Sequence, residues 1–187
     1  MNIKQQNKRP ASPPVLILDG GVVSLSVARS LGSQGIDVYA LNIPQNFARF
    51  SKYAKRIRFS GETMEEWVQW LTGDALKQIS GAVIFPCSDF IMEMVARHRT
   101  RLSDHYILPE ANDNLLLAML DKAETYKISE RIGIPAPKIW HVGSEQEIKR
   151  ILPSITFPCA LKPRFSHEFK GRNFLKKLFI VHNASEL

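Results

Sequence analysis

Two lysines in this sequence could have a chemical function, because of their charge and their positions in predicted elements. Lys122 lies in LDKAETYK at the predicted start of a helix, and Lys162 ends the apolar segment FPCALK, a predicted strand. A nucleotide triphosphate needs positive charge at more than one point, and lysines on different elements supply it as point charges without bidentate geometry. The ordinary alternative is that Lys122 is a solvated helix residue, as most lysines are.

Small and polar residues follow two of the predicted strands. Gly20 and Gly21 come after VLILD, and Ser88 and Asp89 come after AVIFPC. Ligands of open α/β sheets bind outside the carboxyl ends of the strands, so Ser88 and Asp89 are candidates for substrate contact. The glycines do not fit the GxGxxG pattern of a dinucleotide site, and a tight turn explains them better. Helix capping is the simpler explanation for Ser88 and Asp89.

Apolar segments and helical patterns alternate over the first half of the chain and predict a scaffold. The predicted strands are 15–19, 37–42, 53–60, 82–89 and 106–110. Helical spacing predicts helices between them, one of which begins at a capping box formed by Thr63 and Glu66. This alternation is typical of a doubly wound, Rossmann-like parallel sheet. Residues 1–14 are polar and contain prolines, so we expect a disordered leader.

The pattern changes after the fifth predicted strand. Two helical segments, DNLLLAML and DKAETYKISERIG, fall within residues 112–135, which we expect to be a helical linker that follows a first domain at 15–111. Ser144 and Glu147 then have the spacing of a capping box, and FPCALKPR and KLFIVHN are predicted strands of a second sheet. Residues 136–187 are therefore expected to be the incomplete start of a second, α+β unit.

The two lysine segments and the domain ahead of them resemble the ATP-grasp ligases. LDKAETYKISERIGIPAPKI is similar to the opening of the ATP-grasp fold, and FPCALKPR to the strand that carries the family's second phosphate-contacting lysine, with buried neighbours. The resemblance covers residues 15–187. It implies an α/β fold in which a Rossmann-like doubly wound parallel sheet, the pre-ATP-grasp domain, precedes an incomplete α+β ATP-grasp subdomain.

The resemblance implies roles for individual residues. Lys122 and Lys162 would hold the phosphates of ATP. Many family members then have a glycine-rich loop that covers the phosphates through backbone N–H groups, whereas PRFSHEFKGRNFLKK has a single glycine. Ser166, His167 and Lys170 are the candidates for phosphate contact in this loop. An exposed loop histidine is the ordinary explanation of His167.

The resemblance also implies a reaction. The complete enzyme would phosphorylate a small-molecule carboxylate with ATP and let an amine attack the acylphosphate. Gly20 and Gly21 would lie near the acceptor substrate, with Ser88 or Asp89 as further contacts. The Mg²⁺-binding carboxylates and asparagine of the family would lie beyond position 187, so we expect no metal ligand within the chain and no ligase activity from these residues alone.

Two alternatives to a ligase remain. The first is a non-catalytic α/β module that binds a small ligand or regulates a partner, which predicts binding of a small acid without ATP turnover. The second is nucleic-acid binding, because the formal charge of +7 is spread through SKYAKRIRF, ARHRTR and KGRNFLKK. These basic segments contain no motif that reads RNA or DNA, so a solvated face is favoured over a nucleic-acid groove.

Composition excludes several other classes of protein. The 187 residues are 44% hydrophobic, enough for a core, but no run is long and apolar enough to span a membrane and no signal peptide is evident. Cys87 and Cys159 lie in strand-like segments without CxxC spacing, so we expect reduced, structural cysteines in a cytoplasmic protein. The oligomeric state stays open. Trp67, Trp70 and Phe90 could form a homodimer surface, although core packing is the commoner use of such positions.

Overall fold

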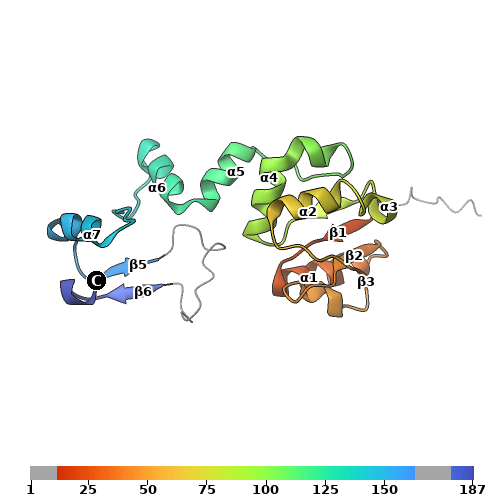
Figure 1. The fold of residues 1–187 in the computed structure, drawn as a ribbon, viewed down its shortest axis with the longest axis horizontal. Coiled ribbons are helices and arrows are strands. Elements are labelled where there is room, and N and C mark those ends of the chain that lie inside the picture. The colour runs from red at the N-terminus through yellow and green to blue at the C-terminus, as the bar shows by residue number, and fades with distance from the viewer. Residues whose placement is uncertain (1–11, 163–177) are drawn as a thin grey trace, which may run out of the picture. The chain divides into compact units, whose positions relative to one another are not determined.

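The computed structural model describes residues 12–162 and 178–187, which form two compact units (Figure 1). The first unit extends to Asp113 and the second begins at Asn114. The finer division into a leader, a sheet domain, a linker and an incomplete second domain stays a prediction. None of the helices in the described ranges has the length and apolar content that crossing a membrane requires.

The first unit is built on a four-stranded parallel sheet. Its strands are β1 Val15–Ile17, β2 Val38–Leu41, β3 Ala54–Ile57 and β4 Val83–Phe85. They lie in the order β3-β2-β1-β4, and each neighbouring pair is parallel. Leu16 and Ile17 of the central β1 are both fully buried because each packs in a different core cluster, one on each face. This arrangement confirms the α/β fold expected from the sequence.

Helices cover both faces of this sheet (Figure 1). The helical elements are α1 Gly21–Gly32, η1 Phe47–Phe50, α2 Met64–Leu71, α3 Leu76–Ile79 and α4 Asp89–Ser103. Residues of α2, α3 and α4 pack in one core cluster, and Ala28 of α1 and Ala48 of η1 pack in the other. A parallel sheet needs this double cover because both of its faces are apolar.

The helix α2 begins at the predicted capping box. The Thr63 hydroxyl accepts a hydrogen bond from the Glu66 N–H at 3.3 Å, and the Glu66 carboxylate accepts one from the Thr63 N–H at 2.9 Å. Trp67 is buried, with ring centroids 4.7 Å from Phe59 and 5.7 Å from Phe90. Trp70 and Phe90 pack against the same core, so these aromatic side chains serve core packing.

The predicted strand at 106–110 is largely absent. Only an isolated parallel bridge joins Ile107 to Val83, because Pro109 has no N–H to extend a ladder. The guanidinium of Arg99 instead holds this segment, donating to the Pro109 carbonyl at 3.0 Å and to both carboxylate oxygens of Asp113 at 2.6 and 2.7 Å. His98 is half-buried at the point where the backbone of α4 departs from helical angles.

The second unit contains helices and a two-stranded sheet. Its elements are α5 Asp113–Leu120 at the junction, α6 Lys122–Arg131, α7 Glu145–Ile151, η2 Leu152–Ser154, β5 Cys159–Leu161, β6 Phe179–Val181 and η3 Ala184–Glu186. The strands β5 and β6 pair antiparallel, with Cys159 opposite Val181. Both predicted strands and the predicted helices are therefore present.

Two expectations for the second unit were wrong in detail. Ser144 caps α7, but the Glu147 carboxylate accepts from the Gly143 N–H at 2.6 Å rather than from Ser144, so only half of the capping box forms. The strand before Lys162 was expected to have buried neighbours, yet Leu161 is 41% exposed. A two-stranded sheet has too few strands to bury its own faces.

Candidate functional site

The turns that follow β1 and β4 meet at the carboxyl-end edge of the sheet, because these two strands are parallel neighbours. The Asp19 carboxylate accepts a hydrogen bond from the Gly20 N–H at 2.6 Å and a second from the Ser88 hydroxyl at 3.2 Å. A single carboxylate therefore links two turns that lie far apart in the sequence. The sequence analysis did not select Asp19, although its position directly before the glycines was an available signal.

Gly20 allows these two turns to approach each other. Its φ is +128°, and a Cβ added there would lie 2.1 Å from the Cβ and 2.7 Å from the carbonyl oxygen of Cys87. Gly21 also has a positive φ, +52°, and its N–H donates to the Gln45 carbonyl at 2.8 Å. The glycines are thus required by backbone conformation and by contact, as a tight turn requires.

The thiol of Cys87 lies beside the Asp19 carboxylate. Burial and, to a smaller extent, the negative charge of Asp19 together raise the pKa of this thiol to about 11. The thiol is therefore protonated at neutral pH and is a poor nucleophile. Cys87 therefore has a structural role at the carboxyl ends of β1 and β4.

The two helices that start at this edge differ in capping. The Ser88 hydroxyl accepts from the Ile91 N–H at 3.4 Å and so caps α4, whereas Gly20 has no side chain with which to cap α1. Within the described part of the chain, the N–H groups of Val22 and Val23 have no hydrogen-bond partner. Asp89 is exposed in the first turn of α4. The structure thus brings Gly20 and Ser88 to one carboxylate, and their contact with a substrate stays a prediction.

The two predicted phosphate-binding lysines lie on different elements of the second unit. Lys122 is the first residue of α6 and is half-buried, directly after Asp121, whose carboxylate caps the helix by accepting from the Ala123 N–H at 2.9 Å. Lys162 directly follows β5 and is exposed. That both reach the same phosphate chain stays a prediction.

The remaining candidates for phosphate contact, Ser166, His167 and Lys170, lie outside the described residues. Among residues 12–162 and 178–187, no three His, Cys, Asp or Glu side chains are grouped so that they could hold a metal ion.

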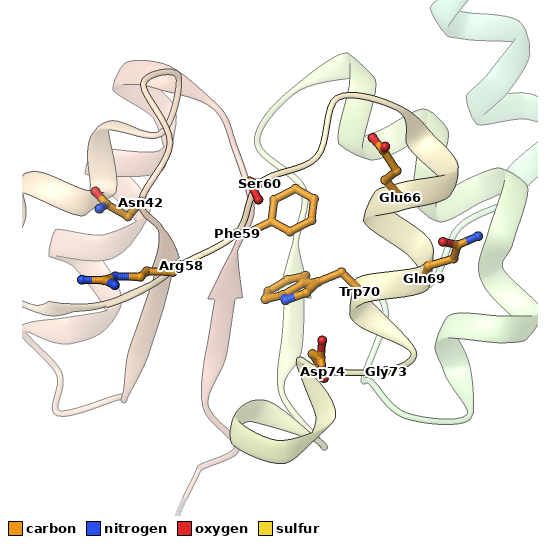
Figure 2. Close-up of a pocket in the computed structure, with 9 residues that line it drawn as sticks. All are labelled: Asn42, Arg58, Phe59, Ser60, Glu66, Gln69, Trp70, Gly73 and Asp74. Carbon is orange, nitrogen blue, oxygen red and sulfur yellow. The ribbon is translucent and has the colours of Figure 1, made fainter.

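A separate hollow of about 830 Å³ lies where β2 and β3 end beside α2 (Figure 2). It is lined by Asn42, Arg58, Phe59, Ser60, Glu66, Gln69, Trp70, Gly73 and Asp74. Figure 2 shows Phe59 and Trp70 close together at its centre, whereas Arg58 and Asn42 point away from this aromatic pair. None of the site residues predicted from the sequence lines this hollow.

Comparison with known proteins reveals relatives in sequence. D-aspartate ligase of Enterococcus faecium is 30% identical over 110 residues, which are 56% of this chain and 26% of the ligase. Formate-dependent phosphoribosylglycinamide formyltransferase of Cronobacter sakazakii is 23% identical over 182 residues, 94% of this chain and 43% of that enzyme. No protein-family model matches.

Solved structures show the same fold. N5-carboxyaminoimidazole synthetase of Staphylococcus aureus, complexed with ADP, matches with a TM-score of 0.67 at 16% identity, over 99% of this chain and 45% of that one. The biotin carboxylase domain dimer of Hydrogenobacter thermophilus 2-oxoglutarate carboxylase, complexed with MgADP, matches with a TM-score of 0.65 at 21% identity, over 95% and 39%.

The chain resembles the N-terminal portion of the ATP-grasp ligases in sequence and in fold. Its parallel sheet corresponds to the domain that begins these enzymes. The chain spans less than half of the length of the relatives and ATP-grasp structures named above.

Proposed function

We propose that the chain is the N-terminal part of an ATP-dependent ligase that joins a small-molecule carboxylate to an amine through an acylphosphate. The 30% identity to D-aspartate ligase over 110 residues carries this proposal. The fold match to an ADP complex over 99% of the chain supports it. D-aspartate ligase and phosphoribosylglycinamide formyltransferase are both named for small-molecule substrates, so we assign small-molecule substrates here as well.

The proposed reaction has two steps. An oxygen of the substrate carboxylate attacks the γ-phosphorus of ATP, the bond to the bridging oxygen breaks, and ADP leaves. The amine nitrogen then attacks the carbonyl carbon of the acylphosphate, loses a proton, and releases inorganic phosphate. Lys122 and Lys162 neutralise the phosphates, and most of the rate enhancement comes from positioning and charge stabilisation.

We assign the acceptor substrate to the edge at which β1 and β4 end. Ligands of open parallel sheets bind there, and the Asp19 carboxylate holds the two turns of this edge in fixed positions. Gly20 lets the backbone of both turns approach closely, and Ser88 and Asp89 begin the helix that leads away. These residues bind and orient the substrate and do not take part in phosphoryl transfer.

Among residues 12–162 and 178–187, no three His, Cys, Asp or Glu side chains are grouped around a possible metal site. The resemblance to the ATP-grasp ligases is our reason for proposing that the Mg²⁺ ligands of the complete enzyme lie beyond residue 187. Mg²⁺ would neutralise charge on the phosphates of ATP when it is bound. The 187 residues alone are accordingly expected to have no ligase activity.

The uncovered apolar surface of the second unit supports this incompleteness. Leu161 and Ile180 of the two-stranded sheet are 41% and 53% exposed, and Ile132 and Ile134 after α6 are 60% and 56% exposed. Exposed large apolar side chains of this kind are often covered by further protein when they form a continuous patch. More than half of the length of each relative lies outside the match to this chain. We propose that the corresponding part of the complete protein forms such a cover.

The experiment compares this chain with the complete product of its gene. ADP release from ATP and Mg²⁺ is measured with a panel of carboxylates and amines. We expect no release from the 187 residues, and release from the complete protein that requires both substrates. Lys162→Ala should lower it by about 100-fold, the effect of removing one preorganised charge, and Lys149→Ala should not.

Two results would contradict the proposal. Turnover by the 187 residues alone would show that the metal and the substrates are held within them. A complete protein that binds small acids without hydrolysing ATP would favour the ligand-binding module over the ligase.

A further inference from the structure

The basic residues of the first unit are concentrated along one edge of its sheet. Residues 38–61 contain five lysines and arginines and no acidic residue. These are Arg49, Lys52, Lys55, Arg56 and Arg58. They lie on η1, on β3 and directly beside them, and β3 is an edge strand.

Most of this charge has no counter-charge nearby. In the described part of the chain, Lys55 has a carboxylate partner, Asp37 at 2.7 Å, whereas Lys52, Arg56 and Arg58 are exposed and have none. Like charges this close repel one another, and an anion bound among them would relieve that repulsion.

Arg49 adds an unsatisfied donor to the same edge. Its Nε is buried and has no hydrogen-bond partner among the described residues. Its guanidinium carbon lies 4.6 Å from the centroid of the Phe50 ring. A buried donor without an acceptor is uncommon, and a bound anion would supply one.

The side chains of Arg56 and Arg58 point to one side of the sheet. Ala54 packs in the core cluster on the α1 side, and Arg56 and Arg58 follow it at alternate positions, so they point to that side. Ala48 places η1 on the same side because it is buried in the same cluster. In Figure 2, Arg58 accordingly points away from Phe59.

An exposed aromatic ring completes this surface. Phe50 is 70% exposed, although it is a large apolar side chain in an ordered turn. A ring beside guanidinium groups is the arrangement on which single-stranded nucleic acids stack their bases while the phosphates pair with cations. The surface has no recognition helix for a duplex groove, and an acidic protein segment would not use the ring in this way.

We propose that this basic edge, formed by Arg49, Phe50, Lys52, Arg56 and Arg58, binds single-stranded nucleic acid. The guanidinium groups pair with phosphates, and one base stacks on Phe50. The edge is made by η1 and β3, so it is distinct from the proposed acceptor edge at β1 and β4 and from the proposed phosphate-binding lysines. It does not depend on the proposed ligase function.

The test is fluorescence anisotropy of the 187-residue chain with a labelled oligothymidylate over a range of salt concentrations. Removing two phosphate contacts with Arg56→Gln and Arg58→Gln should lower the slope of log affinity against log salt by about 1.4. Phe50→Ala should weaken binding about tenfold at every salt concentration and leave the slope unchanged, because stacking is not ionic.

The matched control is Lys149→Gln with Arg150→Gln on α7, two exposed residues whose loss changes the net charge by the same amount. This variant should bind as the wild type does, and far-UV circular dichroism should show that every variant is folded. The proposal is overturned if the wild type does not bind, or if the control loses as much affinity as the Arg56 and Arg58 variant. It is also overturned if Phe50→Ala binds normally or if polyglutamate competes as well as the oligonucleotide.

Discussion

Gly20 lies where the turn after β1 and the turn after β4 come closest. The sequence predicted a glycine turn here, but the reason for the glycine is contact with Cys87, a residue far away in the chain. Asp19, in contrast, was not singled out by the sequence analysis. An aspartate after a strand is an ordinary turn residue, and only its hydrogen bond to Ser88, 69 positions away, distinguishes it.

Replacement of Gly20 by alanine should destabilise the first unit strongly. The new Cβ would meet the Cys87 side chain at 2.1 Å while the backbone holds a φ of +128°. Strain and overpacking each cost about 1–3 kcal/mol, so the free energy of unfolding should fall by about 2–6 kcal/mol, measured by urea denaturation. Gly35→Ala is the control, since φ is +81° there but nothing lies within 4 Å of the added Cβ. Its cost should be about 1–2 kcal/mol. Equal losses would show that the contact with Cys87 does not matter.

Cys87 should react slowly with iodoacetamide. Burial and the Asp19 charge raise its pKa to about 11, so little thiolate is present at pH 8. In a Cys159→Ser background, labelling followed by mass spectrometry should be at least about tenfold slower than for free cysteine, whose pKa is about 8.5. Asp19→Asn removes the smaller cause and should accelerate labelling. A Cys87 that reacts as free cysteine does would contradict the burial of this thiol.

At the scale of elements, local patterns were predicted best. The capping box of α2 formed because Thr63 and Glu66 are three residues apart and need no partner from elsewhere. The same spacing at Ser144 gave only half of the box, because the Glu147 carboxylate bonds to the Gly143 N–H. The predicted strand at 106–110 is reduced to an isolated bridge because Pro109 has no N–H to extend a ladder, and Arg99 donates to the Pro109 carbonyl instead.

The capping box makes the stability of the first unit depend on pH. The Thr63 N–H, and then the Glu62 N–H, donate hydrogen bonds that hold the pKa of Glu66 below its ordinary value of 4.5. A lowered folded-state pKa gives stability that is present above pH 4.5 and lost as the pH falls through the folded value. Glu66→Gln should therefore be less stable than the wild type at pH 7, and this difference should vanish in acid.

Thermal unfolding across this pH range measures the effect of Glu66. Glu62→Gln is the control, because the Glu62 side chain accepts no backbone hydrogen bond in the box. A difference between wild type and Glu66→Gln that persists undiminished at low pH would mean that the charge of the carboxylate is not what stabilises α2.

At the scale of the whole molecule, the two units differ in how much they bury. The first unit has two core clusters, whereas the described residues of the second unit that are buried are Asp121, Ala123 and Val181. Local stability follows buried apolar contact, so the units should not be equally stable.

Hydrogen exchange measured by mass spectrometry should show this difference directly. In the 187-residue chain we expect the amides of β5 and β6 to exchange much faster than those of β1 and β2, because their sheet has two strands and an uncovered face. In the complete protein, β5 and β6 should become protected. Equal protection of both sheets in the isolated chain would show that the second unit is stable without a cover.

The kinds of elements and their order followed from the sequence. Apolar runs, helical spacing and local caps depend on neighbouring residues, so they predicted the parallel sheet and the helices. The resemblance to ATP-grasp ligases rested on the segments that contain Lys122 and Lys162. Tertiary structure alone decided which distant residues meet. The link from Asp19 to Ser88 exists because β1 and β4 are neighbours. The basic edge likewise exists because η1 and β3 lie on one side of the sheet, and strand order and facing cannot be derived from local spacing.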